Sequence, residues 1–395
     1  MGKREDIDAL IGSLTEFQKG MRVEEVLEAA LADPQPTQER LKQIEQALET
    51  FRDLGALGGD DPGDLHMVAT LARAYERLSH LEKAYECFRT ALSLAERLDD
   101  SPRRAEMLSR IGNVLAKWSR WEEALDHLAR SQALYGELDD TQGQATVALR
   151  RGVVYSRQGD YASATTAYEE ALALAQEIDY RKVITAARNN LANIATIRGN
   201  LDEAIEWQKS CIRMYEEADD ARGLAGAYHN LGRTYSYKKD WGAAMDAYEH
   251  GFEIAQKHEF LDTMANIHVH MASVLLELGN SLMVPFCCSR ALDIYKKLGD
   301  HLGEADTYRL LAKSFVMRKE WETAESLFHD ALKLKEEYGD PLGVAETLRD
   351  LGKMQMAQKH KQDARKTLEA SLEEFRKLGA EGDTADVEGL INGLD

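Results

Sequence analysis

Histidines and cysteines are the side chains of this sequence that could bind a metal ion or take part in catalysis. The segment HVH places His268 and His270 two residues apart. On a helix this spacing turns the two side chains about 200° away from each other, so they do not converge on one ion. The cysteines are spaced neither as metal ligands nor as a disulfide framework, and we expect reduced thiols at Cys87, Cys211, Cys287 and Cys288. We also expect Cys287 and Cys288 to be buried packing residues.

Known catalytic motifs are missing from the sequence. It contains no HExxH, no GxSxG and no Walker motif, and the glycine-rich segment GALGGDDPGD lacks the GK[ST] of a phosphate-binding loop. We therefore expect no catalytic residue, no bound metal and no cofactor. The sequence predicts that the protein is not an enzyme.

The charge and the hydropathy pattern exclude further classes of partner. The formal net charge is −20, whereas nucleic acids and anionic membranes attract basic surfaces. No apolar run approaches the roughly 18 residues that cross a bilayer, and the N-terminal MGKREDIDAL has no apolar signal region. We expect a cytoplasmic protein that binds no nucleic acid and does not insert into a membrane.

A period of 40 residues organises most of the chain. Small residues recur at the twelfth position of each repeat: Ala72, Gly112, Gly152, Ala192, Gly232, Ala272, Ala312 and Gly352. A second series recurs at the twenty-fourth position: Ala84, Ala124, Ala164, Ala204, Ala244, Val284, Ala324 and Ala364. Small residues at fixed positions mark places where helices approach closely, and β-branched and aromatic residues are sparse. The pattern predicts an all-α protein with two helices in each repeat.

The turn between the two helices falls near the twentieth residue of each repeat. Asp160, Asn200, Asp240 and Asn280 stand there as N-cap candidates for the second helix. Three tryptophans follow the turn at the same phase, and we expect them to pack between repeats: Trp121, Trp241 and Trp321.

The alternation of small and large residues in NLGRTYSYKKDWGAAMDAYEHGFEIA resembles the tetratricopeptide repeat (TPR) family. The 40-residue form is similar to the arrays of Pins-type G-protein signalling modulators and kinesin light chains. The resemblance implies a right-handed superhelical solenoid of about eight helix-turn-helix units, which holds an extended peptide in its concave groove. We expect an N-terminal helical cap at residues 1–60, eight TPR units at 61–380 and a C-terminal capping segment at 381–395.

The first helix of each repeat lines the concave surface in such a solenoid. Helical spacing puts repeat positions 9, 10, 13 and 17 on one stripe of that helix. Of these 32 residues eleven are Lys or Arg and only two, Glu277 and Asp350, are acidic, in a chain where acidic residues outnumber basic ones. We expect the peptide-binding residues among Arg110, Asn113, Arg150, Asn189, Asn193, His229, Asn230, Arg233, Tyr237, Arg309 and Lys313. The alternative is that these cations pair with acidic side chains of the neighbouring repeat, as surface ion pairs commonly do.

Asparagines on this stripe could grip a peptide backbone, because an amide offers both a donor and an acceptor. Asn193 and Asn230 match the two asparagines of the carboxylate-clamp members of the TPR family. The cationic positions of that clamp are instead Asn189, Asn266 and His270. This departure favours an extended peptide with acidic side chains over a carboxylate tail. His229 and His270 would add pH sensitivity to the groove.

The sixth repeat is irregular, because Pro285 falls within its expected second helix. A proline past the first turn removes a hydrogen bond and bends a helix. We expect a kink or a change of superhelical pitch near residues 281–288, and a hinge there is the stronger version of this hypothesis.

Together these features predict a protein–protein interaction scaffold or adaptor that binds an extended, partly acidic peptide segment of a partner protein. The alternative is a peptide-responsive regulatory sensor that changes superhelical pitch to control an effector protein. Self-association through a terminal repeat stays open.

Overall fold

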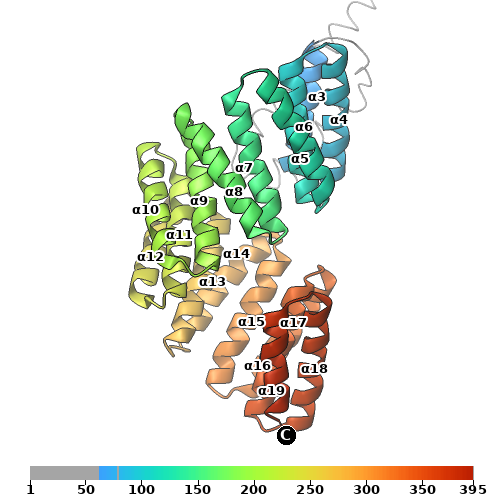
Figure 1. Cartoon of the computed structure of the whole chain (residues 1–395). Helices are drawn as coiled ribbons and strands as arrows, with labels where there is room; N and C mark the ends of the chain where they lie inside the picture. Colours follow the sequence, from blue (N-terminus) through green and yellow to red (C-terminus); the bar gives the residue numbers. More distant parts are fainter. Residues whose placement is uncertain (1–61, 78–79, 395) are drawn as a thin grey trace, which may run out of the picture. The chain divides into compact units, whose positions relative to one another are not determined.

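The computed structural model describes residues 62–77 and 80–394 (Figure 1). This part of the chain is built from 17 α-helices and contains no strand. The helices are α3 (Pro62–Arg77), α4 (Leu81–Arg97), α5 (Ser101–Lys117), α6 (Trp121–Glu137), α7 (Thr141–Arg157), α8 (Tyr161–Glu177), α9 (Arg181–Ile197), α10 (Leu201–Glu217), α11 (Ala221–Tyr237), α12 (Trp241–Lys257), α13 (Leu261–Glu277), α14 (Val284–Leu298), α15 (His301–Met317), α16 (Trp321–Glu337), α17 (Pro341–Ala357), α18 (Lys361–Lys377) and α19 (Glu381–Asn392). The predicted all-α class is confirmed. The expected N-terminal cap at 1–60 lies outside the described residues.

The chain divides into two compact halves, Met1–Ile194 and Ala195–Asp395. Within each half, consecutive helices pack against each other as hairpins, for example α7 with α8 and α11 with α12 (Figure 1). In the C-terminal half the first helices of successive repeats also touch, since α11 contacts α13, α13 contacts α15, and α15 contacts α17. These four helices present the predicted stripe of the C-terminal half. No helix in the described ranges is long and apolar enough to cross a membrane.

Aspartate caps and left-handed residues close the short turns between helices. Asp160 accepts a hydrogen bond from the Ser163 backbone N–H at 3.0 Å, and Asp240 accepts one from Ala243 at 3.2 Å, as predicted. Asn200 occupies the N-cap of α10, but its side chain makes no capping hydrogen bond. From α5 on, the residue before the cap takes a positive φ in every described turn except the one before α14. An example is 81° at Gly199, a conformation that glycine adopts without a steric penalty.

Small residues allow the two helices of a hairpin to approach closely, as the period predicts. A β-carbon at Gly232 would lie 2.5 Å from Cε1 of Tyr248, which projects from α12. Gly152 stands in the same relation to Tyr168 of α8. Every residue of the twenty-fourth-position series, including Val284, has an exposed fraction of 0%. The repeat pattern therefore follows from helix-to-helix packing.

The irregular sixth repeat differs from expectation. Helix α14 begins at Val284 and has 15 residues, whereas α13 and α15 have 17. Pro285 therefore stands in the first turn, where its missing N–H leaves no hydrogen bond unmade. The interpretation of Pro285 as a kink inside the helix is wrong, and so is Asn280 as N-cap, because Met283 takes that place. The change of pitch and the hinge stay predictions.

Helix α19 packs against the last helix pair at the C-terminal end of the chain. Val387 and Leu394 join a buried cluster with Ala364, Leu368 and Phe375. This contact removes the apolar face of α18 from water and so stabilises the end of the stack.

Candidate functional site

Two neighbouring cavities open on the first helices of the C-terminal half. The larger one, here called the Arg233 cavity, has a volume of about 670 Å³. Its walls come from α11, the turn after it, α12 and α13: Arg233, Ser236, Tyr237, Lys239, Trp241, Tyr248, His270, Ser273 and Glu277. The smaller one, the Lys313 cavity, has a volume of about 250 Å³. It is lined by Leu276, Glu277, Lys313, Val316, Met317, Phe328, Asp350, Lys353 and Met354. Glu277 belongs to both walls, so the two cavities are adjacent.

The structure thus brings three of the predicted residues, Arg233, Tyr237 and Lys313, to these cavities. Arg233 and Lys313 both occupy the thirteenth position of their repeats, and Tyr237 follows Arg233 by about one turn on α11. Tyr237 is 62% exposed at the end of α11, and Lys313 is exposed on α15. The stripe therefore presents one aromatic ring and two cations to solvent.

Arg233 is half-buried and has no counterion. Within the described part of the chain its guanidinium makes no hydrogen bond and no ion pair, and the same holds for the ammonium of Lys313. A partly desolvated cation without a counterion is costly to maintain, and a bound anion would offset that cost.

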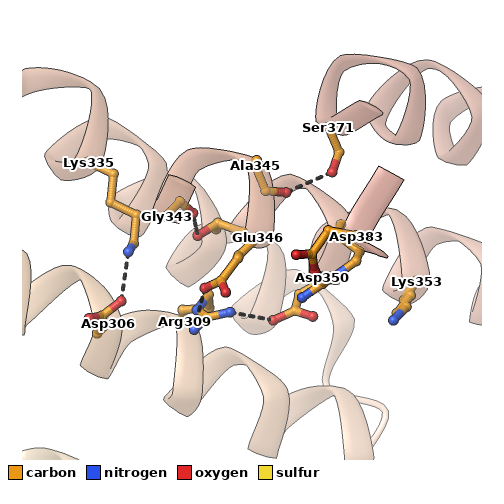
Figure 2. A network of polar contacts seen from close by, with 12 residues as sticks. Asp306, Arg309, Lys335, Gly343, Ala345, Glu346, Asp350, Lys353, Ser371 and Asp383 are labelled. Carbon is orange, nitrogen blue, oxygen red and sulfur yellow. Dashed lines mark hydrogen bonds and ion pairs between the residues drawn. The ribbon is translucent and has the colours of Figure 1, made fainter. Parts of the chain in front are cut away.

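Other cations of the stripe are paired inside the protein. Arg309 faces Glu346 at 3.0 Å and Asp350 at 3.3 Å, both from α17 (Figure 2). Farther along, Arg349 of α17 contacts Asp383 and Asp386 of α19. For these residues the alternative interpretation holds, since each cation is neutralised by the next repeat.

A buried ion pair lies beside this network. Lys335 of α16 is 1% exposed, and its Nζ donates to Asp306 at 2.7 Å and to Asp340 at 2.9 Å (Figure 2). Asp340 also accepts a hydrogen bond from the Gly343 N–H at the start of α17. These contacts hold the pKa of Asp340 below its usual value, although partial burial acts in the opposite direction.

In the N-terminal half three of the predicted residues contact other side chains of the same helix or of a neighbouring first helix. Arg110 pairs with Glu106 at 3.3 Å, and the Asn113 amide donates to Glu76 of α3. Arg150 donates to Ser109 of α5, and burial and the charge of Arg110 lower its pKa. Asn189 and Asn193 are half-buried on α9. The pairing of these cations and of Asn113 restricts what they can offer a ligand.

His270 of the Arg233 cavity forms a pair with His229, which lies behind the cavity wall. The rings of His229 and His270 lie 4.9 Å apart between centroids, and Tyr248 stacks on His270 at 6.0 Å. Burial lowers the pKa of His229 to about 3 and that of His270 to about 4, and repulsion from Arg233 adds to both shifts. Both rings are therefore neutral at neutral pH. Asn230 follows His229 on α11 and is half-buried.

Several cavity residues were not among the predicted peptide-binding residues. His270 was expected only to add pH sensitivity to the groove, and Glu277 was one of the two acidic residues of the stripe. Tyr248 and Trp241 come from α12, and only the hairpin packing brings them to the same cavity. Trp241 also packs against the core between repeats, as predicted.

The remaining candidates for chemistry are structural. Cys287 and Cys288 are buried, as predicted, and burial raises the pKa of Cys288 to about 12. His268 packs on Phe252 at 4.7 Å, away from the neighbours of His270. Among the residues for which positions are described, no three His, Cys, Asp or Glu side chains are arranged to hold a metal ion.

Comparison with known families fits this architecture. The model of the tetratricopeptide repeat matches residues 64–137, 103–177, 183–257 and 263–337, which together make up more than half of the chain. The chain belongs to the tetratricopeptide repeat family. The predicted family is thus confirmed, and the cavities lie on the first helices of TPR hairpins.

Solved structures share this TPR fold at low sequence identity. Aspartyl phosphate phosphatase F from Bacillus subtilis is 11% identical with a TM-score of 0.60, over 90% of this chain and 93% of that one. The apo form of the quorum sensor NprR from B. thuringiensis is 17% identical with a TM-score of 0.57, over 95% and 99%. A Rap protein complexed with Competence and Sporulation Factor is 14% identical with a TM-score of 0.55, over 96% of both chains. No curated protein matches the sequence significantly.

Proposed function

We propose that this TPR protein is a non-enzymatic scaffold that binds an extended, partly acidic peptide segment of a partner protein across the Arg233 and Lys313 cavities. The observation that carries the proposal is Arg233 itself, a half-buried cation without a counterion in a cavity of about 670 Å³. An acidic side chain of the partner would supply the missing charge and form charge-assisted hydrogen bonds.

The lining of the two cavities fits a peptide rather than a small anion. Ser236, Ser273 and His270 offer hydrogen bonds to backbone groups beside Arg233. The Lys313 cavity is more apolar, with Met317 and Met354 in its wall, and it would accept an aliphatic side chain. Glu277 lies in both walls and disfavours an acidic group between the two cavities. A segment with an acidic residue followed by an apolar one is therefore the preferred ligand.

The predicted residues of the N-terminal half are proposed as a peptide-binding stripe of that half by itself. Asn189 and Asn193 would hold a peptide backbone there, because their amides are half-buried on the first helix of a repeat. Arg110 and Arg150 would contribute positive charge to this stripe and Asn113 an amide, although all three already contact neighbouring residues.

The second candidate function is a peptide-responsive regulator. Structures with the same fold over nearly the whole chain include a quorum sensor and a Rap protein complexed with Competence and Sporulation Factor. For such a regulator the peptide would change the arrangement of the repeats and so control an effector. Small-angle scattering with and without a bound peptide separates the two, because a rigid scaffold keeps its dimensions and a regulator changes them.

The proposal is tested by screening an array of short peptides against the wild-type protein and then against Arg233→Met and Lys313→Met. Groups at the centre of a binding site are commonly worth about 2 kcal/mol, so each substitution should weaken the selected acidic peptides about 30-fold. Lys333→Met is the matched control, since Lys333 is exposed on α16 outside both cavities. Selected peptides that bind both cavity variants as tightly as the wild type would refute the site.

A further inference from the structure

Three groups that can each carry a positive charge meet at the Arg233 cavity. The rings of His229 and His270 are 4.9 Å apart, and the charge of Arg233 acts on both. His270 lines the cavity, whereas His229 lies behind it with a buried Nε2 that has no hydrogen-bond partner in the described structure. Tyr248 closes the other side, with its ring centroid 6.0 Å from His270 and 6.1 Å from His229.

The helices around the histidine pair bring almost no compensating negative charge. Helix α11 contributes Arg233 and Tyr237, α12 contributes Tyr248, and the turn between them contributes Lys239. On α13, Glu277 lies in the cavity wall two turns beyond His270. On α14, the charge of Arg290 adds to burial in lowering the pKa of His268, which is not one of the paired histidines.

Helix α15 brings the one carboxylate that acts on the pair, Asp306 on His270. Its Oδ1 already accepts a hydrogen bond from the buried Lys335 at 2.7 Å. Among the described residues, the charges that shift the pKa of these two rings are those of Arg233, of His270 on His229, and of Asp306 on His270. The cluster therefore combines one fixed cation with two groups that can become cations. Of the described carboxylates near it, Asp306 is engaged by Lys335, and Glu277 lies two turns along α13 from His270.

We propose that His270, His229 and Arg233 form a proton-coupled carboxylate subsite, in which an acidic side chain of the bound segment enters together with one proton on His270. The inference rests on the proposed function and specifies that protonation of His270 controls the affinity of that site for its ligand. In the bound state Arg233 and the charged His270 both donate hydrogen bonds to the carboxylate. The proton comes from solvent, and the unpartnered Nε2 of His229 accepts a hydrogen bond from the charged ring.

The coupling follows from the sign of the local charge. Without a ligand, burial and Arg233 keep the pKa of His270 at about 4. A carboxylate beside the ring replaces net repulsion with attraction, and this raises the affinity of the ring for its proton. By linkage, the proton then raises the affinity of the site for the carboxylate by the same factor. If binding restores the ordinary pKa of 6.5, the site binds about tenfold more tightly at pH ~5.5 than at pH ~7.5.

The test uses N-acetyl-aspartate N-methylamide as the probe, which is one acidic residue with a capped backbone. The full-length protein is labelled with ¹³C-histidine, and the ring signals of His229 and His270 are followed against pH by NMR. We expect the probe to raise the pKa of His270 and to bind about tenfold more tightly at the lower pH of ~5.5. The asparagine analogue of the probe should leave the pKa unchanged.

Two variants complete the experiment. His270→Gln should abolish the pH dependence of probe binding, whereas His329→Gln should retain it, because His329 is exposed on α16 away from the cavity. An unchanged pKa of His270 at saturating probe, equal affinity at both pH values or no probe binding at all would overturn the inference. Peptides from the array that depend on Arg233 but not on pH would overturn the inference and leave the proposed function standing. A probe-dependent pKa with no peptide binding would refute the proposed function instead.

Discussion

Substitution of two glycines on the same helix tests the packing that positions the Arg233 cavity. Gly232 and Gly226 both lie within α11. A β-carbon at Gly232 would lie 2.5 Å from Cε1 and 2.6 Å from Cδ1 of the buried Tyr248, whereas a β-carbon at Gly226 would meet no atom within 4 Å. Gly232→Ala and Gly226→Ala therefore make the same chemical change in opposite surroundings.

The expected free energies of unfolding follow from these distances. Alanine is favoured over glycine inside a helix by about 1 kcal/mol, so Gly226→Ala should stabilise the protein by about 0.5–1 kcal/mol. At Gly232 the same gain is opposed by the clash, since the Tyr248 ring must move by about 1 Å to restore van der Waals contact. Overpacking of this kind costs about 1–3 kcal/mol, so the two variants should differ by about 2 kcal/mol.

The assay is urea unfolding followed by circular dichroism, with wild type, Gly226→Ala and Gly232→Ala measured in parallel. Because repeat proteins can unfold in more than one step, the comparison uses the transition that is shifted by both variants. If Gly232→Ala were as stable as Gly226→Ala, the close approach of α11 to α12 would be refuted. The position of Tyr248 in the cavity wall would then be wrong as well.

Three further predictions concern charge and reactivity. His229→Gln should reduce the loss of stability on acidification by up to about 1.4 kcal/mol per pH unit, measured by urea unfolding at several pH values. The sign follows because the native ring has a pKa of about 3, so the unfolded chain binds more protons below pH 6.5 and the contribution of His229 is lost as pH falls. Lys335→Met should destabilise the protein by about 2 kcal/mol in the same assay, because it leaves two aspartates without their shared cation, whereas Lys333→Met should change stability by less than about 0.5 kcal/mol. Cys288 is buried with a pKa raised to about 12, so Ellman's reagent should label it only after unfolding; labelling of the native protein would contradict its burial.

The fold could be predicted closely from the sequence, because the same pattern of small residues recurs in every repeat. Each hairpin needs small residues where its helices touch, and eight copies at the same spacing make that requirement visible. Gly232 of α11 and Ala244 of α12 stand at the predicted contacts, and Asp240 caps the start of α12. The sixth repeat was misjudged because a shift of helix start by three residues, from the position of Asn280 to Met283, leaves the period unchanged.

The candidate site could be predicted only as a stripe. Helical periodicity placed Arg233, Lys313 and Arg309 on it together, but it could not distinguish a free cation from a paired one. That distinction depends on what the next repeat places opposite each residue. Glu346 and Asp350 neutralise Arg309, while no acidic side chain among the described residues pairs with Arg233.

The sequence by itself therefore determined the helical repeat, its period and its family, and it predicted the stripe on which we expect a ligand to bind. These properties arise from interactions within a hairpin, which recur at a fixed spacing and need no knowledge of the neighbouring repeats. Only the tertiary structure decided which charges are available, where the cavities open and that His229 lies against His270. Charge compensation and burial depend on side chains some 40 residues apart in sequence, and only the packing of one repeat on the next brings such side chains together.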